Sequence, residues 1–152
     1  MRLPGTTPAA PGDIGSADPA LVGALAEGSP HAVATALLTS RVLVPVVALP
    51  SAGDAEMAVP ALVDVEGRRA LPVFSSYDAL RAWQPDARPV PMTGARVLAG
   101  AAAEGYDGVV LDVAGPVSHT ISGKDLATLA AAAQALVDNP RARIQVAPPD
   151  EA

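Results

Sequence analysis

The stretch "LPVFSSYDALRAWQP", Leu71 to Pro85, passes from an apolar run directly into an amphipathic one. The β-branched and aromatic residues that end at Phe74 are typical of a strand. Ser75-Ser76-Tyr77-Asp78 then has the spacing of a capping box, in which Ser75 accepts a hydrogen bond from the Asp78 amide. The sequence therefore predicts a strand that leads directly into a short helix ended by Pro85.

A second strand-like run precedes this stretch. Val59 to Glu66 and Arg69 to Phe74 flank Gly67-Arg68, which predicts a β-hairpin with a two-residue type II′ loop that has Gly67 first. Asp64 and Glu66 share one parity along the first arm, so we expect one side of the distal hairpin to face water.

Cap signals and periodicity divide the rest of the chain into alternating elements. We expect helices at Pro19–Glu27 (capped by Asp18 and closed by Gly28), Pro30–Thr39, Gly94–Glu104 (capped by Thr93) and from Ser122 to Val137, and strands at Arg41–Leu49, Arg88–Met92 (an edge strand), Gly108–Val113 and Ile144–Val146. This order predicts an α/β (mixed α+β) single domain, with a mixed sheet of about five strands and helices packed on it.

Composition sets the domain boundaries. With 152 residues and 50% hydrophobic residues, the chain fits one domain, which we place at residues 18–147. Residues 1–17 are rich in Pro, Gly, Thr and Ala without periodicity, and residues 148–152 are polar, so both ends are expected to be disordered tails.

Charge and cysteine content narrow the classes of function. A net charge of -6 without a basic stripe argues against a nucleic-acid partner. The absence of cysteine excludes thiol nucleophiles, disulfides and cysteine-ligated zinc, and suits a reducing compartment. The longest apolar run, Val42 to Pro50, is too short to span a bilayer, and the first residues have no apolar leader segment. We expect a cytoplasmic protein without membrane contact.

Sequence motifs for catalysis and cofactors are missing. No two glycines have the spacing of a dinucleotide-binding loop, and no serine lies in Gly-x-Ser-x-Gly. Gly100 and Gly105 have P-loop spacing, but Tyr106 and Asp107 replace the residues that hold phosphate and magnesium. Two histidines without an HExxH motif give no zinc site. We predict no catalytic residue, no metal and no cofactor.

Three of the four aromatic residues, Phe74, Tyr77 and Trp83, lie close together in the sequence. Tyr77, Leu80 and Trp83 share one side of the predicted helix. Aromatic residues at this spacing usually pack in a core, and the alternative is a partner-facing patch with Trp83 as its anchor.

Polar residues gather at the start of the last predicted helix. His119, Ser122, Gly123 and Lys124 form a candidate anion site, because a helix N-terminus favours negative charge. Asp112, at the end of the preceding strand, could join His119 in acid–base chemistry. The structural alternative is a loop histidine, a capped helix and a solvated lysine.

One pair of carboxylates has a spacing that glycosidases could use. Asp64 and Glu66 are about 7 Å apart by strand rise. No neighbouring residue would raise either pKa, so we favour a solvated hairpin face.

The order of these segments resembles the N-terminal domain of the SseB family, in its actinobacterial branch. The matching stretches are "RVLVPVVA" (41–48), "MAVPAL" (57–62), "GRRALPVFSSYDALRAW" (67–83), "RPVP" (88–91) and "VVLDVAGP" (109–116). The resemblance spans roughly residues 20 to 137 and implies a fold rather than a reaction. It carries no catalytic residue over to this chain.

Three hypotheses follow. The leading one is a non-catalytic cytoplasmic interaction or adaptor module that binds a protein partner through Phe74, Tyr77 and Trp83. The second is a small-molecule sensor that binds an anionic metabolite at the helix start near His119. The third is an enzyme that uses Asp112 and His119.

Overall fold

The computed structural model describes residues 15–49 and 56–139. The described elements are α1 (Pro19–Glu27), α2 (Pro30–Thr39), β1 (Arg41–Leu49), β2 (Glu56–Ala58), β3 (Leu62–Val63), β4 (Arg69–Val73), α3 (Tyr77–Trp83), β5 (Arg88–Thr93), α4 (Gly94–Ala103), β6 (Gly108–Leu111), β7 (His119–Ser122) and α5 (Gly123–Asp138). A mixed α+β single domain was predicted and is confirmed. The strand predicted at Ile144–Val146 lies outside the described residues.

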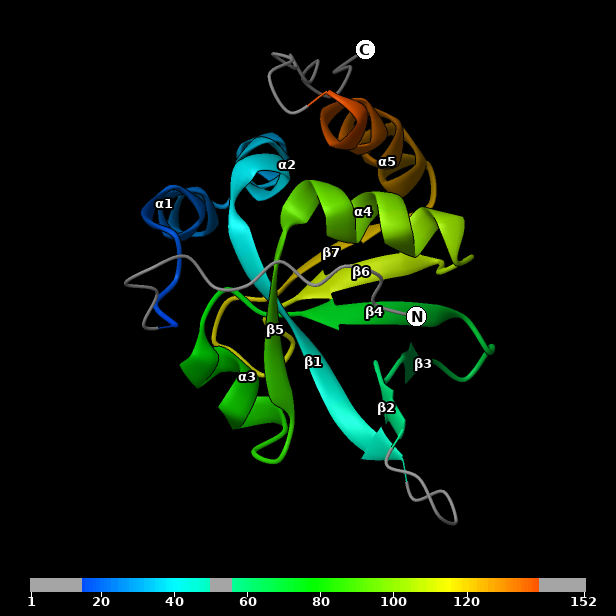
Figure 1. The fold of residues 1–152 in the computed structure, drawn as a ribbon. Coiled ribbons are helices and arrows are strands. Elements are labelled where there is room, and N and C mark those ends of the chain that lie inside the picture. Colours follow the sequence, from blue (N-terminus) through cyan, green and yellow to red (C-terminus); the bar gives the residue numbers. More distant parts are fainter. Residues whose placement is uncertain (1–14, 50–55, 140–152) are drawn as a thin grey trace.

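The strands form two groups joined at one point. The first has the order β2-β1-β5 and is antiparallel; the second has the order β3-β4-β6-β7, with β4 and β6 parallel. Leu43 of β1 and Phe74 exchange two backbone hydrogen bonds of 2.8 and 2.9 Å, which connect the groups. Helices α4 and α5 cover one face of the four-stranded group (Figure 1).

Strand β1 is buried on both faces, as its apolar sequence predicts. Val42 and Val44 lie in the main core beneath the helices, whereas Leu43 lies in a second cluster with Phe74 and Leu80. Leu43 directs its N–H to Phe74, so Pro45 directs its nitrogen to the same side of β1, between Phe74 and β2. The proline therefore sits where the ladder changes partner and no donor is needed.

Local cap signals place the first helices and α4 correctly. The side chains of Asp18, Ser29 and Thr93 each accept a hydrogen bond from a first-turn amide, and Gly28 closes α1 with a φ of 75°. Gly94, the first residue of α4, meets α2 so closely that an added Cβ would lie 1.6 Å from the Leu37 carbonyl oxygen. Only glycine permits this approach.

The hairpin between β3 and β4 differs from the predicted two-residue loop. Val63 pairs with Arg69, Asp64 accepts from the Gly67 amide at 3.1 Å, and Gly67 has a φ of 82°. This is a three-residue loop, with a turn followed by a left-handed glycine, so Gly67 comes last rather than first. The Asp64 side chain stabilises this loop conformation, since its Oδ1 accepts hydrogen bonds from the amides of both Glu66 and Arg68 at 2.9 Å.

Two helix starts also differ from prediction. Ser76, and not Ser75, caps α3 by accepting from the Ala79 amide at 3.1 Å. Ser122 precedes α5 but its side chain makes no cap hydrogen bond. The segment before it, His119–Ser122, is a strand that the sequence did not predict. It pairs antiparallel with β6, so its conformation depends on a strand distant in sequence rather than on local propensity.

Candidate functional site

The aromatic residues do not form one exposed patch. Phe74 is completely buried (0% exposed) and therefore belongs to the core, which contradicts its predicted role as a partner contact. Trp83 is half-buried and packs on Phe74 with ring centroids 5.5 Å apart. Tyr77 remains exposed, with the Arg81 guanidinium 5.3 Å from its ring centre. Its amide donates to the Gly15 carbonyl at 2.8 Å, so residues ahead of α1 lie against α3.

Asp112 is buried and bonded to a residue outside the predicted site. Its Oδ1 accepts from the Ser75 amide at 2.8 Å, and its Oδ2 accepts from the Ser75 hydroxyl at 2.5 Å. Asp112 has a φ of 54°, a conformation that Asp tolerates better than most residues. The carboxylate thus ties the end of β6 to the end of β4. Both of its oxygens are engaged in that contact.

The structure separates the four candidate anion-site residues. Ser122 and Gly123 line an open cavity of about 550 Å³, whereas His119 and Lys124 are not among its lining residues. Partial burial lowers the pKa of His119 below its ordinary value of 6.5, which favours the neutral imidazole. Lys124 is exposed in the first turn of α5. His119 and Lys124 therefore do not line the cavity that Ser122 and Gly123 line.

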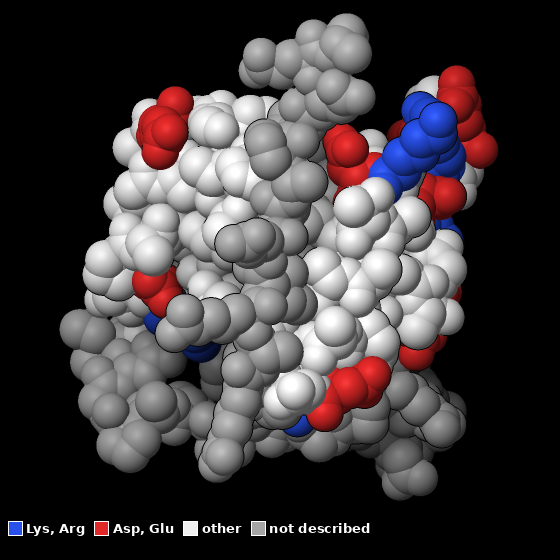
Figure 2. Space-filling view, turned by 90° about the horizontal axis from the view of Figure 1, so that it is seen from above, with Lys and Arg blue, Asp and Glu red and all other residues white. Residues whose placement is uncertain are grey.

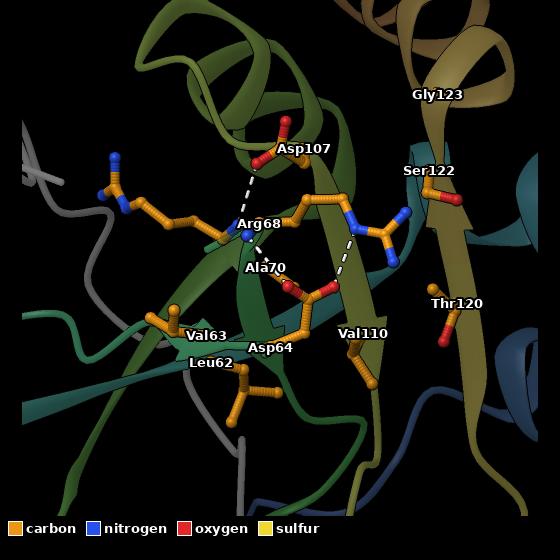
Figure 3. Close-up of a pocket in the computed structure, with 12 residues that line it drawn as sticks. Leu62, Val63, Asp64, Arg68, Ala70, Asp107, Val110, Thr120, Ser122 and Gly123 are labelled. Carbon is orange, nitrogen blue, oxygen red and sulfur yellow. Dashed lines mark hydrogen bonds and ion pairs between the residues drawn. The ribbon is translucent and has the colours of Figure 1, made fainter. Parts of the chain in front are cut away.

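The cavity lies over the face of the four-stranded group opposite to α4 and α5. Side chains that alternate with the buried ones form its floor, since Leu71, Val109 and Ile121 point into the core and their neighbours point the other way. Figure 3 shows Ala70 and Val110 on this floor, with Thr120 and Ser122 on β7 to one side. No described helix covers it.

Charged residues frame the cavity in compensated pairs. Arg68 donates to Asp64 Oδ2 from Nε at 2.7 Å (Figure 3). A terminal guanidinium nitrogen of Arg68 also lies 3.2 Å from a Glu66 carboxylate oxygen. The hydrogen bond from the Arg68 side chain is the main cause that lowers the pKa of Asp64 below 3.8. The predicted Asp64–Glu66 pair is thus an exposed pair held by one arginine. It is not an acid–base pair.

Arg69, the second arginine beside the cavity, also makes contacts with its neighbours. Its backbone amide donates to Asp107 Oδ2 at 2.8 Å, and the Arg69 guanidinium lies 4.6 Å from the ring centre of the buried Tyr106. Arg68 is thus paired with two carboxylates, whereas the Arg69 guanidinium stacks on the Tyr106 ring. Since the floor is mostly apolar, the cavity suits an apolar group more than an anion.

Two valines beside the cavity are the clearest features that the sequence interpretation missed. Val63 is 63% exposed, and Val65 at the loop tip is fully exposed. We name as the hairpin surface the residues Leu62, Val63, Val65, Ala70 and Val110. Leu62 and Val63 point to opposite sides of the hairpin, because their partners in β4 are Ala70 and Arg69. The sequence contains a signal for these exposed valines, because Val63 and Val65 alternate with Asp64 and Glu66. The sequence interpretation missed it because it assumed that the side of the hairpin with the valines is buried.

Metal and membrane sites were also sought in residues 15–49 and 56–139. In this part of the chain no three His, Asp or Glu side chains gather as metal ligands would. Nor does any described helix have the length and apolar character needed to cross a bilayer.

The arrangement of helices and strands defines a small, mixed α+β domain. The family model "SseB protein N-terminal domain" matches residues 18–143, and the chain belongs to the SseB family. No curated protein and no solved structure matches the chain.

Proposed function

We propose that this domain is a non-catalytic, cytoplasmic protein-interaction module whose contact surface is the hairpin surface. The observation that carries the proposal is the exposure of Val63 and Val65 on a hairpin beside an uncovered sheet face. Contiguous exposed apolar side chains on a soluble domain mark interaction sites more often than isolated ones do.

The rigidity of the loop supports this role. Asp64 accepts from two backbone amides and from the Arg68 guanidinium, and these bonds fix the loop that presents Val65. A surface that is already ordered loses less conformational entropy on binding, so more of the contact energy appears as affinity. The cavity next to Val63 offers space for a partner's apolar side chain.

The α3 segment is a weaker contact surface. The contact with Phe74 covers part of the Trp83 ring. Of the three predicted contact residues, Tyr77 is the one with an exposed side chain. We therefore move the predicted interface from α3 to the hairpin surface.

Affinity purification of tagged chain from the native host tests the proposal. The double variant Val63→Asp, Val65→Asp should reduce the amount of specific partner recovered at least tenfold, because each aspartate places a charge in an apolar contact. Val22→Asp and Val117→Asp are matched controls, since both valines are 48% exposed and belong to other surfaces. Loss of the partner with Val22→Asp, or its full recovery with the hairpin variant, would contradict the assignment.

A second candidate function, small-molecule sensing, is favoured by one feature. The Ser122 side chain lines the cavity and does not cap α5, which leaves its hydroxyl for a ligand. A ligand at a hundred times its dissociation constant would stabilise the fold by about 2.7 kcal/mol. Thermal-shift screening of the wild-type chain would detect such a ligand. Ala70→Phe is the control, because its side chain fills the floor of the cavity. An equal shift of the melting temperature in both proteins would exclude the cavity as the site.

A further inference from the structure

We propose that two copies of this chain associate through the outer edge of β7, which no other described strand pairs with, and form one continuous eight-stranded sheet. The inference is independent of the proposed function, because it concerns a different edge of the same sheet. It rests on the protection of the sheet edges, the direction of the β7 backbone groups and the surface of the adjoining helix.

Among the described strands, β7 is the least protected edge. The edge strand β5 contains Pro89 and Pro91, which cannot donate to a new partner strand. β3 has two residues and β2 has three, so neither offers a long ladder. β7 has four residues, "HTIS", without proline or lysine, the residues that commonly block edge pairing.

The backbone N–H and C=O groups of Thr120 point away from β6, the strand that β7 pairs with. The Asp112 amide donates to the Val73 carbonyl, so in β6 the groups of Val110 also face β4, while those of Val109 and Leu111 face β7. Their register partners on β7 are Ile121 and His119. Because strand residues alternate, the N–H and C=O of Thr120 lie on the outer edge.

A second copy fits this edge because the surface can meet itself. A two-fold axis perpendicular to the sheet, midway between the two Thr120 residues, would pair them with both backbone hydrogen bonds, as an isologous contact requires. In such a contact a charged residue near the axis would face the same charge on the second copy, which destabilises the pair. The exposed side chains of β7, Thr120 and Ser122, are uncharged.

The helix that follows β7 presents two exposed alanines, with Lys124 before them and Asp138 after them on the same side of the helix. Ala127 and Ala131 of α5 are exposed and share one side of the helix, opposite to Leu136, which packs on the core. Small side chains allow the α5 helices of two copies to lie close together on the same face of the joined sheet. Seen from the helix side, most of the visible surface is uncharged, and the largest group of charged side chains, with basic and acidic residues together, lies at one edge (Figure 2).

The absence of cysteine permits a direct test by a single introduced thiol. In the proposed dimer the two Cβ atoms at position 120 lie roughly 5 Å apart. Thr120→Cys should therefore form a disulfide-linked dimer under mild oxidation. Thr35→Cys, an exposed threonine on α2, is the control and should remain largely monomeric. Equal crosslinking of the two variants would overturn the proposal.

Light scattering after size exclusion, over a range of concentrations, completes the test. The wild-type chain should approach twice the mass of one chain, and Thr120→Lys should weaken the dimer at least tenfold by placing two like charges opposite each other. Thr35→Lys should leave it unchanged. Thr120→Pro removes only the outward N–H and should give a folded monomer. A wild-type monomer at every concentration, or a dimer that persists in both position-120 variants, would refute the β7 interface.

Discussion

Replacing Asp112 with alanine should destabilise the fold strongly, because the carboxylate has a structural task. The change removes the acceptors of the Ser75 amide and hydroxyl, which are buried. Each unsatisfied buried group costs about 1–3 kcal/mol. Alanine at a φ of 54° adds roughly 1 kcal/mol of backbone strain. We expect the free energy of unfolding to fall by about 3–7 kcal/mol in Asp112→Ala.

Asp112→Asn provides the graded comparison. Asparagine tolerates the left-handed backbone and keeps one carbonyl acceptor, so the loss should be about 1–2 kcal/mol. Ser75→Ala removes the partner hydroxyl, and a double-mutant cycle between positions 75 and 112 should give a coupling of at least about 1 kcal/mol.

Urea denaturation, followed by circular dichroism and by the fluorescence of the single tryptophan, measures these values. Trp83 packs on Phe74, next to Ser75, so its emission reports on this cluster. An Asp112→Ala protein as stable as wild type, or more stable, would refute the reasoning. That result would instead be typical of a functional residue that the fold accommodates at a cost.

Further predictions concern the core, the titrating groups and the hairpin. Gly94→Ala should lower the free energy of unfolding by about 3 kcal/mol or prevent folding, because its Cβ meets the Leu37 carbonyl; thermal melts would detect this, and an unchanged melting temperature would contradict the close approach. Because burial lowers the pKa of His119 in the folded state, the unfolded chain binds its proton first as the pH falls below 6.5, so stability is lost on acidification. His119→Asn should reduce that loss between pH 7.5 and 5, measured by urea titrations at each pH; an identical loss in both proteins would exclude His119 as its source. Arg68→Ala should raise the pKa of Asp64 towards 3.8, as NMR titration of the carboxyl would report, and an unchanged pKa would show that the Arg68 side chain is not its cause.

Local signals predicted much of this fold. The caps at Asp18, Ser29 and Thr93 and the apolar periodicity of α4 are encoded within a few residues, and each helix begins where its cap predicts. The same local reasoning failed where two adjacent serines could both act as cap. Ser75 is taken by Asp112, 37 residues away, so Ser76 caps α3. A contact at that separation leaves no local trace in the sequence.

The candidate site was harder to predict than the fold. Phe74 and Trp83 were singled out together as partner contacts, but the burial of Phe74 depends on β1 crossing beside it, which periodicity alone does not specify. Strand β7 was missed because its pairing with β6, rather than its own propensity, defines it. Without that strand the cavity between the hairpin and β7 could not be anticipated, although Ser122 and Gly123 were among the residues singled out.

Site-specific photocrosslinking in living cells tests the proposed interface most directly. A photoreactive amino acid at position 65, which is fully exposed, should form a covalent adduct with a discrete protein. The same amino acid at position 22 on α1 should form none. An adduct at position 77 without one at position 65 would contradict the hairpin surface and return the interface to α3.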